Sequence, residues 1–194
     1  KRQTPRSVNS RPAGNPTGWS FFQAVRQLES SHPDKPRIGK SQHAHEDPVR
    51  FRQDPSLAFP PSSVAAYREN DDGRPPHLHV RFLGLTGCAA PMPLFFTEYV
   101  LNRLRHHADP TLARFLDLFH HRMISLFYRA WAANQQAVSF DRDDDDPFAR
   151  YIGSLIGRGT DPLRQRDAVS DVAKLHYAGR LAGPTANAEG LTAI

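Results

Sequence analysis

The sequence predicts an α+β fold that is predominantly α-helical, with a few short β-strands. Apolar residues recur at helical spacing in several segments, most densely at about 93–134. Two short segments instead alternate apolar residues with Arg or His, as strands with one wet face do. The 194 residues are 39% hydrophobic, which suits one medium core. We expect the helical pair at 93–134 to form a bundle that faces both this core and a partner.

The two ends of the chain differ in composition from the segment between them. Residues 1–17 are rich in Pro, Gly, Asn and Arg and carry almost nothing apolar, so we expect a basic, disordered arm. Residues 18–182 hold the periodic segments and form the predicted core domain. Residues 183–194 begin with Gly-Pro and predict a linker followed by the start of another helix. The chain is therefore expected to be the N-terminal portion of a longer protein.

The first predicted element is an amphipathic helix from Trp19 to about Ser30. Thr17 and Ser20 are both available as its N-cap. Its apolar side chains fall on one helical face, which we expect to be buried. They are Phe21, Phe22, Val25 and Leu28.

Short strands are predicted after a polar, proline-broken loop at residues 31–47. Val49 and Phe51 alternate with Arg in the first, and the segment from Leu78 to Phe82 alternates with His and Arg. The prolines and polar residues between the two strands argue against a long regular element there. The sequence leaves open whether these strands complete a sheet without a partner.

Two consecutive helices are predicted at about Pro93–His107 and Asp109–Asn134. The first is apolar on more than one side, so we expect it to be buried on more than one side. The second carries apolar residues at alternating spacings of four and three, as in a heptad seam. The seam is Leu112, Leu116, Phe119, Met123, Leu126 and Ala130, and the apolar arc is widened by Phe115, Phe127 and Trp131. This helix therefore has more apolar surface than one core face requires.

Shorter helices are predicted after a loop at residues 135–146 that ends in an acidic run. Asp146 and Pro147 fit the N-cap and first position of a helix through about Ile156. A second Asp-Pro pair at 161–162 opens the next helical stretch, and residues 168–181 continue helically. The acidic run itself fits either a solvated loop or an acidic docking patch.

The composition indicates the cellular compartment of the protein, but it does not distinguish a protein partner from a nucleic-acid partner. Basic residues outnumber acidic residues by 25 to 20, and nearly all of them are Arg, which binds carboxylates and phosphates alike. Cys88 is the single cysteine, so no internal disulfide can form and a reducing compartment is indicated. No apolar run approaches the roughly 20 residues that cross a bilayer. These features predict a cytoplasmic protein without direct membrane insertion.

Neither a metal or cofactor site nor an active site is predicted. The pairs His43/His45 and His77/His79 each lack a local third ligand, so they fit a polar loop and a wet strand face. Cys88 has no local base, and the chain has neither a GxSxG serine motif nor a phosphate-binding GK[ST] loop. We therefore expect a protein that is not an enzyme.

A basic nucleic-acid-binding module is the alternative interpretation. Its support is the set of arginines on or beside the two aromatic helices, namely Arg103, Arg105, Arg114, Arg122 and Arg129. Arg122 and Arg129, however, flank the apolar arc, where pairing with acidic groups at a protein interface is favoured. A nucleic-acid binder should present a continuous, solvent-facing basic stripe. The main prediction therefore includes no nucleic acid.

Several segments, in order, resemble the TssG family of type VI secretion, also called ImpH or VasB. They are GWSFFQAVRQLE, DPVRFR with LAFPPS, FLGLTG through PLFFTEYVLNRLR, FLDLFHHRMISLFYRAW, and HYAGRLAG followed by AEGL. The resemblance covers roughly residues 18–191. The segment FLDLFHHRMISLFYRAW is the most specific of these, being far longer than a lone short motif.

The resemblance implies a structural role in the baseplate of a contractile injection machine. Proteins of this family join two copies of TssF in a wedge through a helical core bundle. Their later extensions dock TssK trimers, and contacts with TssE, the sheath and the spike are indirect. The resemblance thus implies a location at the baseplate, docked to the inner-membrane complex. It also implies that residues 183–194 begin the TssK-docking region.

Protein-interface candidates follow from the apolar arcs and the arginines at their rim, because aromatic and Arg anchors dominate many interfaces. The candidates are Leu94, Tyr99, Phe119, Arg122, Met123, Phe127, Arg129 and Trp131.

Overall fold

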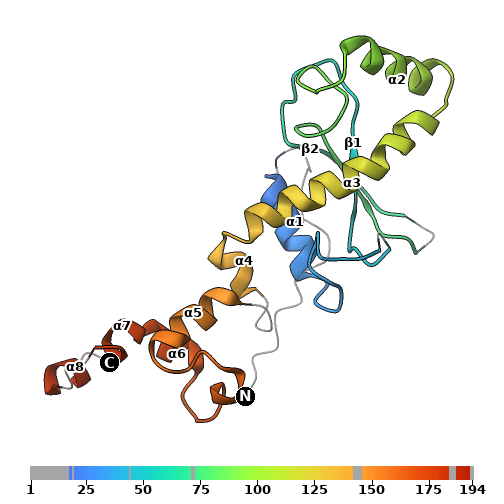
Figure 1. The fold of residues 1–194 in the computed structure, drawn as a ribbon. Coiled ribbons are helices and arrows are strands. Elements are labelled where there is room, and N and C mark those ends of the chain that lie inside the picture. Colours follow the sequence, from blue (N-terminus) through green and yellow to red (C-terminus); the bar gives the residue numbers. More distant parts are fainter. Residues whose placement is uncertain are drawn as a thin grey trace. The chain divides into compact units, whose positions relative to one another are not determined.

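A computed structural model describes residues 18, 20–43, 45–70, 73–141, 146–183 and 187–192 (Figure 1). It divides into an N-terminal unit, Lys1–Asn134, and a C-terminal unit, Gln135–Ile194. The division falls inside residues 18–182, for which the sequence predicts one core domain. The predicted basic arm and residues 142–145 of the acidic run lie outside the described residues.

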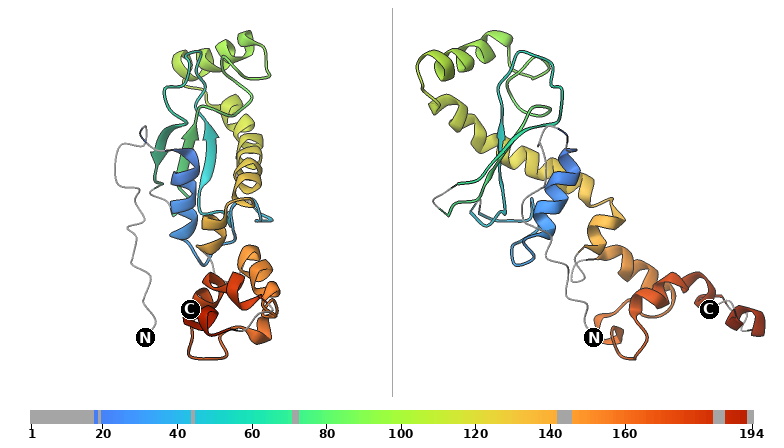
Figure 2. Two further views of the ribbon diagram at one scale, coloured as in Figure 1. Left: turned by 90° about the vertical axis from the view of Figure 1, so that its left-hand side faces the viewer. Right: turned by 180° about the vertical axis from the view of Figure 1, so that it is seen from behind.

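In its described residues, the N-terminal unit combines three helices with a three-stranded sheet of order β1-β3-β2. Strand β1 pairs with β3 in parallel, and β2 pairs with β3 antiparallel. Helices α1 and α3 lie alongside the strands (Figure 2). The α+β, mostly helical prediction is confirmed. The elements are α1 (Phe21–Ser30), β1 (Arg50–Gln53), β2 (Val64–Arg68), β3 (His77–Val80), α2 (Leu94–His106) and α3 (Thr111–Ala132).

Strand β2 is an element of this unit that the sequence did not predict. Its five residues, VAAYR, include two alanines and offer no clear alternation, so pairing with β3 rather than propensity forms the strand. Val64 lies opposite Val80 and Arg68 opposite His77, with an irregularity in register between Val64 and Ala66. The three strands therefore pair with one another within this chain, without a strand from a partner.

The hydrophobic core of this unit draws on α1, the sheet, the loop before β1 and α3. On β1 and β3 the alternation is as predicted, since Phe51, Leu78 and Val80 are buried while the residues between them are only half-buried. The core cluster is Phe21, Val25, Leu28, Ile38, Val49, Phe51, Val64, Leu78, Val80, Ile124 and Tyr128.

One buried carboxylate ties α1 to α3 and to the loop between α1 and β1. Glu29 Oε1 accepts the Ile38 N–H at 2.9 Å, and Glu29 Oε2 accepts the Tyr128 hydroxyl at 3.2 Å. Tyr128 lies outside the predicted heptad seam, yet it is fully buried. A buried acceptor of this kind is costly to leave unpaired, so the three segments are held in one arrangement.

Side chains of α3 bind the free edge of β1. Parallel pairing with β3 leaves alternate N–H groups of β1 facing away from the sheet. The Phe51 N–H donates to His121 Nδ1 at 3.2 Å, and the Gln53 N–H donates to Asp117 Oδ1 at 3.1 Å. Residues two apart on a strand are about 6.6 Å apart, and residues four apart on a helix rise about 6 Å, so the spacings match. We call this pair of contacts the edge clamp.

The edge clamp fixes the tautomer of His121. Its Nδ1 accepts the Phe51 N–H, so the ring proton is on Nε2, which donates to Asp47 Oδ2 at 2.9 Å. Both His121 and Asp47 are buried. The imidazole therefore links α3 to the residues before β1 as well as to β1 itself.

The C-terminal unit consists of short helices. The predicted Asp146 N-cap is confirmed, since its carboxylate accepts the N–H groups of Phe148 and Ala149 at 3.0 and 3.2 Å. The helical stretch predicted at 168–181 is divided near Tyr177 into two short helices. Helix α4, the first of this unit, was not predicted. The elements are α4 (Gln136–Phe140), α5 (Pro147–Leu155), the 3-10 turn η3 (Asp161–Leu163), α6 (Asp171–His176), α7 (Ala178–Leu181) and α8 (Ala188–Thr192).

We expect Asp117→Ala to lower the free energy of unfolding by at least about 2 kcal/mol, because it leaves the Gln53 N–H and the His120 ring N–H without their acceptor. Asp117→Asn keeps one carboxamide oxygen and should cost less. Urea unfolding of the two variants, beside the exposed control Asp34→Ala, measures this. Equal stability of all three would show that the edge clamp contributes nothing.

Candidate protein-interaction surface

Helix α3 presents an apolar face to solvent as well as one to the core. Phe115, Phe119, Met123 and Leu126 are between 41% and 54% exposed. They recur at spacings of four, four and three, so they lie on one side of the helix, away from Asp117 and His121. Phe115 and Phe119 pack edge to face, with ring centroids 5.5 Å apart. We call these four residues the outer stripe.

Most of the predicted heptad seam therefore does not face the core. Leu116 is buried, whereas Phe119, Met123 and Leu126 of the seam belong to the outer stripe and Ala130 is also exposed. The core side of α3 is instead built from His120, His121, Ile124, Ser125 and Tyr128. A pattern based on apolar residues alone overlooks polar side chains that are buried because they are hydrogen-bonded.

Helix α2 adds further exposed apolar surface. Only Thr97 and Val100 are buried, so the expectation of burial on more than one side is wrong for this chain by itself. Leu94, Phe95 and Tyr99 are all more than half exposed. Phe95 was not among the predicted interface residues, although its spacing of four from Tyr99 is a signal that could have found it.

The structure brings three of the predicted interface residues together on α3 and gives the others separate surroundings. Phe119 and Met123 lie in the outer stripe, and Phe127, 42% exposed, lies between the stripe and the core. Its ring contacts those of Phe22 and Phe82, each at 5.7 Å between centroids. The interface role of all these residues stays a prediction.

Trp131 contributes to the core rather than to an open surface. Its ring stacks on Phe22 with centroids 4.4 Å apart, and it also contacts Tyr128 at 5.7 Å. Removing this side chain would disturb the fold as well as any interface, so Trp131 is a poor choice for testing an interface.

Arg122 and Arg129 bind the loop between α1 and β1. Arg122 Nη1 donates to the Ser41 carbonyl oxygen at 3.4 Å, and Arg129 Nη1 donates to the Gly39 carbonyl oxygen at 3.0 Å. Gly39 has a φ of +82°, and a Cβ there would meet the Ser125 carbonyl oxygen at 2.8 Å. These two arginines therefore hold the loop against α3. Their guanidinium groups are then less available for the continuous basic stripe expected of a nucleic-acid binder.

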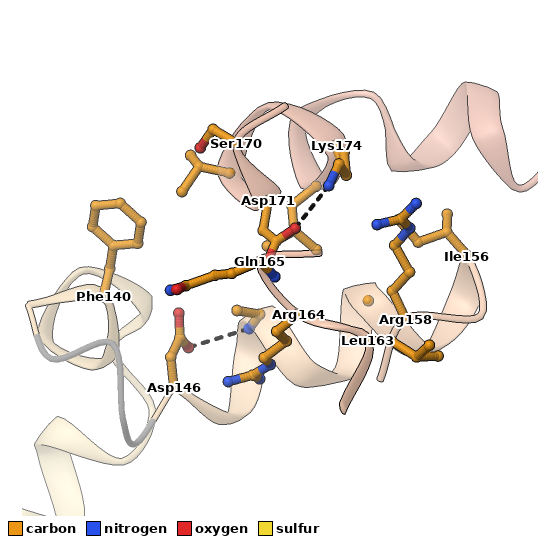
Figure 3. Close-up of a pocket in the computed structure, with 14 residues that line it drawn as sticks. Phe140, Asp146, Ile156, Arg158, Leu163, Arg164, Gln165, Ser170, Asp171 and Lys174 are labelled. Carbon is orange, nitrogen blue, oxygen red and sulfur yellow. Dashed lines mark hydrogen bonds and ion pairs between the residues drawn. The ribbon is translucent and has the colours of Figure 1, made fainter. Parts of the chain in front are cut away.

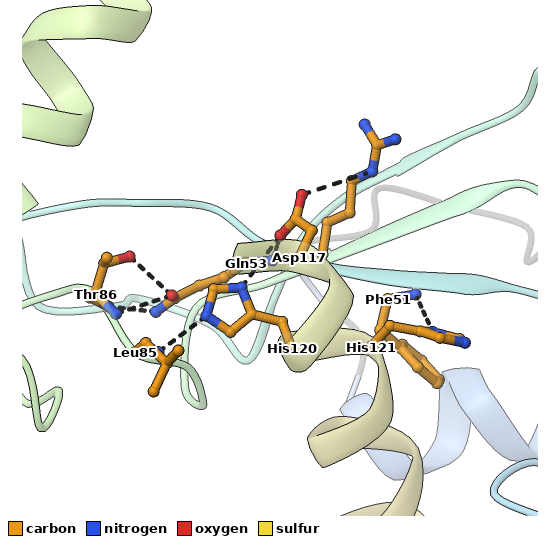
Figure 4. A network of polar contacts seen from close by, with 8 residues as sticks. Phe51, Gln53, Leu85, Thr86, Asp117, His120 and His121 are labelled. Atoms are coloured by element: carbon orange, nitrogen blue, oxygen red, sulfur yellow. Dashed lines mark hydrogen bonds and ion pairs between the residues drawn. The ribbon is translucent and has the colours of Figure 1, made fainter. Parts of the chain in front are cut away.

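A buried polar network joins β1, α3 and the loop after β3 (Figure 4). Asp117 Oδ1 contacts His120 Nδ1 at 3.2 Å, and His120 Nε2 accepts the Leu85 N–H at 3.0 Å. Gln53 Oε1 accepts both the N–H and the hydroxyl of Thr86. Because both ring nitrogens of His120 are engaged, this carboxylate–imidazole pair has no free nitrogen to act as a general base.

This network explains why glycines stand at positions 84 and 87 of the FLGLTG segment. The Gln53 side chain occupies the space that a Cβ on Gly84 would fill. Gly87 has a φ of +127°, which L-residues rarely adopt, and its N–H donates to Thr97 Oγ1 on α2 at 3.0 Å. The segment thus places α2 relative to β1 and α3.

The two histidine pairs lie in the loop before β1 and on β3. His43 and His45 stack with ring centroids 5.5 Å apart, and His77 and His79 lie two apart on β3. Within the ranges that the structure describes, no three of His, Cys, Asp or Glu are grouped as metal ligands.

The C-terminal unit has an apolar patch and a pocket of its own. Phe148, Tyr151 and Leu155 recur at spacings of three and four on α5 and are more than 40% exposed, a signal that sequence reasoning missed. A pocket of about 350 Å³ lies between α5 and α6 (Figure 3). Lys174, which lines it, is paired with Asp167 and Asp171, so this charge is already compensated within the unit.

Comparison with known families decides the assignment. A sequence model described as "Type VI secretion, TssG" matches residues 15–194. The chain belongs to the TssG family. The resemblance identified from the quoted segments is therefore confirmed, and the match continues through the C-terminal unit.

A solved structure is also similar to this TssG-family chain. It is described as "The baseplate complex from the type VI secretion system", and the matching chain has 30% sequence identity and a TM-score of 0.58. The match covers 95% of this chain and 52% of that chain, so the chain spans about half the length of the solved relative. No curated protein matches the chain. Within the described residues of this family member, no helix is long and apolar enough to cross a membrane.

We expect the stability of the N-terminal unit to fall as the pH is lowered from 6.5 towards 4. Burial, followed by the charges of Arg52, His79 and Arg50, lowers the pKa of His77 to about 4. The unfolded chain, with an ordinary histidine pKa of about 6.5, then binds more protons in this window, so acidification favours unfolding. The contribution of His77 to this slope should stay below about 1.4 kcal/mol per pH unit, the limit for one proton, and His79, whose pKa is also lowered, adds to it.

The measurement is the free energy of unfolding at several pH values for the unmodified chain and for His77→Gln. The variant should show a flatter pH dependence, whereas the exposed control His107→Gln should not. An unchanged slope in His77→Gln would contradict the assignment of this pH dependence to His77.

Proposed function

We propose that the chain is a structural subunit of the type VI secretion baseplate and that it binds neighbouring subunits through the outer stripe and α2. The observation that carries this proposal is the apolar surface of Phe115, Phe119, Met123 and Leu126, which runs along α3 and stays about half exposed among the described residues. Contiguous exposed apolar surface of this kind marks sites of protein association. The 22 residues of α3 give it a length of about 33 Å, enough to pack along a partner helix.

The partner in direct contact with the outer stripe is TssF, in two copies, and TssK trimers dock elsewhere on the full-length protein. Contacts with TssE, the sheath and the spike are indirect in this proposal. The support is membership of the TssG family and similarity to a chain in a solved baseplate complex. The corresponding location is the baseplate, at the cytoplasmic side of the inner-membrane complex.

The role is structural rather than catalytic. Supporting this, the carboxylate and imidazoles of the buried network in the N-terminal unit hydrogen-bond to backbone groups of β1 and of the loop after β3. The hydrogen-bonding capacity of these groups holds α3 against the sheet. The apolar character of the outer stripe also fits association driven by burial better than recognition of a charged substrate.

The double substitution Phe119→Ser and Met123→Ser should weaken co-purification with TssF by about thirtyfold or more, because anchors at the centre of an interface often cost at least 2 kcal/mol when truncated. Both side chains are half exposed, so the chain should stay folded. The measurement is pull-down of the co-expressed pair in high salt, with circular dichroism as the check on folding.

The matched control is Phe59→Ser, which removes an 84% exposed phenylalanine from the loop between β1 and β2. It should leave co-purification unchanged. If the folded double variant assembles like the control, the outer stripe is not the contact surface. Recovery of nucleic acid in place of TssF would favour the alternative binding module.

A further inference from the structure

The outer face of the sheet is occupied mainly by basic side chains. Register places Arg50 and Arg68 on either side of His77, so these three residues form one row across the strands. Arg52 lies opposite His79 in the next row. Since neighbouring strands are about 4.8 Å apart and alternate residues of a strand share a face, these groups lie close together. We call them, together with Arg114 of α3, the basic sheet face.

The positive charge of this face is not balanced within the unit. Arg52 Nε lies 3.7 Å from Asp117 Oδ2, but the other oxygen of Asp117 already accepts hydrogen bonds in the edge clamp and from His120. Among the described residues, Arg50, Arg68 and Arg114 have no ion pair. Asp54 also lies near His79, but it is paired with Arg81 at 2.8 Å. Asp117 is therefore left to face several guanidinium groups.

The electrostatic state of the face agrees with this geometry. Burial lowers the pKa of Arg52, Asp117 opposes this, and the nearby guanidinium groups of Arg114, Arg50 and Arg68 lower it further. The pKa of His79 is likewise lowered, by burial first and then by Arg68 and Arg52. Near neutral pH the histidines are thus uncharged, and the arginines alone carry the positive charge. The arginines of β1 and β2 lie two strand spacings apart with uncharged histidines of β3 between them, so clustering of like charge on this face costs stability in the isolated chain.

Guanidinium groups bind carboxylates and phosphates through paired N–H donors, so the ligand is an anion. A protein segment fits the face better than nucleic acid. The cross-strand rows of this face consist of Arg, His and Ala66 and hold no Phe, Tyr or Trp ring for bases to stack on. The strands are four or five residues long, about 13–17 Å, which is short for a tract of phosphates.

We propose that the basic sheet face binds a carboxylate-rich segment of a partner protein, with Arg50, Arg52 and Arg68 as the principal donors and Arg114 at the border. Arg50 and Arg52 point to the same side of β1 about 6.6 Å apart, which matches acidic side chains at alternate positions of an extended segment. The two half-buried histidines between the arginines reduce the hydration of the bound carboxylates. This site is formed by residues other than the outer stripe, so it goes beyond the proposed function.

The test compares two triple variants of the whole chain that lose the same charge. In one, Arg50, Arg68 and Arg114 are each replaced by Gln, which leaves the Arg52–Asp117 pair intact. In the control, the exposed Arg105, Arg150 and Arg180 are each replaced by Gln. The probe is a fluorescein-labelled peptide of alternating Glu and Ser, and its binding is followed by anisotropy at low and at physiological salt. A single-stranded DNA of equal charge is the competing probe.

We expect the sheet-face variant to bind the peptide about tenfold more weakly than the control, as three partly exposed ion pairs would allow. Its melting temperature should equal or exceed that of the unmodified chain, because self-repulsion has been removed. Equal peptide binding by the two variants overturns the proposal. So does preferential binding of DNA that depends on the same arginines, or unfolding of the sheet-face variant, which would give these arginines a structural role.

Discussion

The arrangement of the N-terminal unit depends on how α3 meets the open edge of β1. An edge strand exposes unpaired N–H groups, and here the acceptors come from one turn of a helix rather than from another strand. Because Asp117 and His121 must both face β1, the rotation of α3 about its axis is determined. Ile124 and Tyr128 then necessarily enter the core, and the outer stripe necessarily points away from it.

Much of the architecture could be read from the sequence because it rests on local periodicity. The α1 helix, strands β1 and β3, the two long helices and the Asp146 cap all follow from spacing and capping rules. Strand β2 could not be predicted in this way, since its alanines have weak strand preference and its conformation comes from pairing with a segment distant in sequence. The short helix α4 lacks the length that makes a helical pattern recognisable.

The sequence predicted that α3 carries an apolar interaction surface, but it did not predict which residues form that surface. The sequence showed that α3 has more apolar surface than one core needs, but periodicity does not say which arc is covered. The residues that decide this, Asp117 and His121, are polar, and a hydrophobic pattern assigns polar residues to the outside. Trp131 and Phe127 illustrate the same limit, since both pack on Phe22, a residue more than one hundred positions earlier in the chain. The basic sheet face likewise appears only once β2 lies beside β3.

The edge clamp also constrains how the length of this chain can vary. A residue inserted into α3 between Asp117 and Tyr128 would rotate everything beyond it by about 100° and shift it by about 1.5 Å. The contacts with β1, with Glu29 and with the stack on Phe22 could then no longer be made together. The edge clamp therefore fixes the rotation of α3 about its own axis, and every later contact of the helix depends on that rotation. Insertions and deletions in homologous chains should be confined to the loops, leaving the spacing from residue 117 to residue 131 invariant.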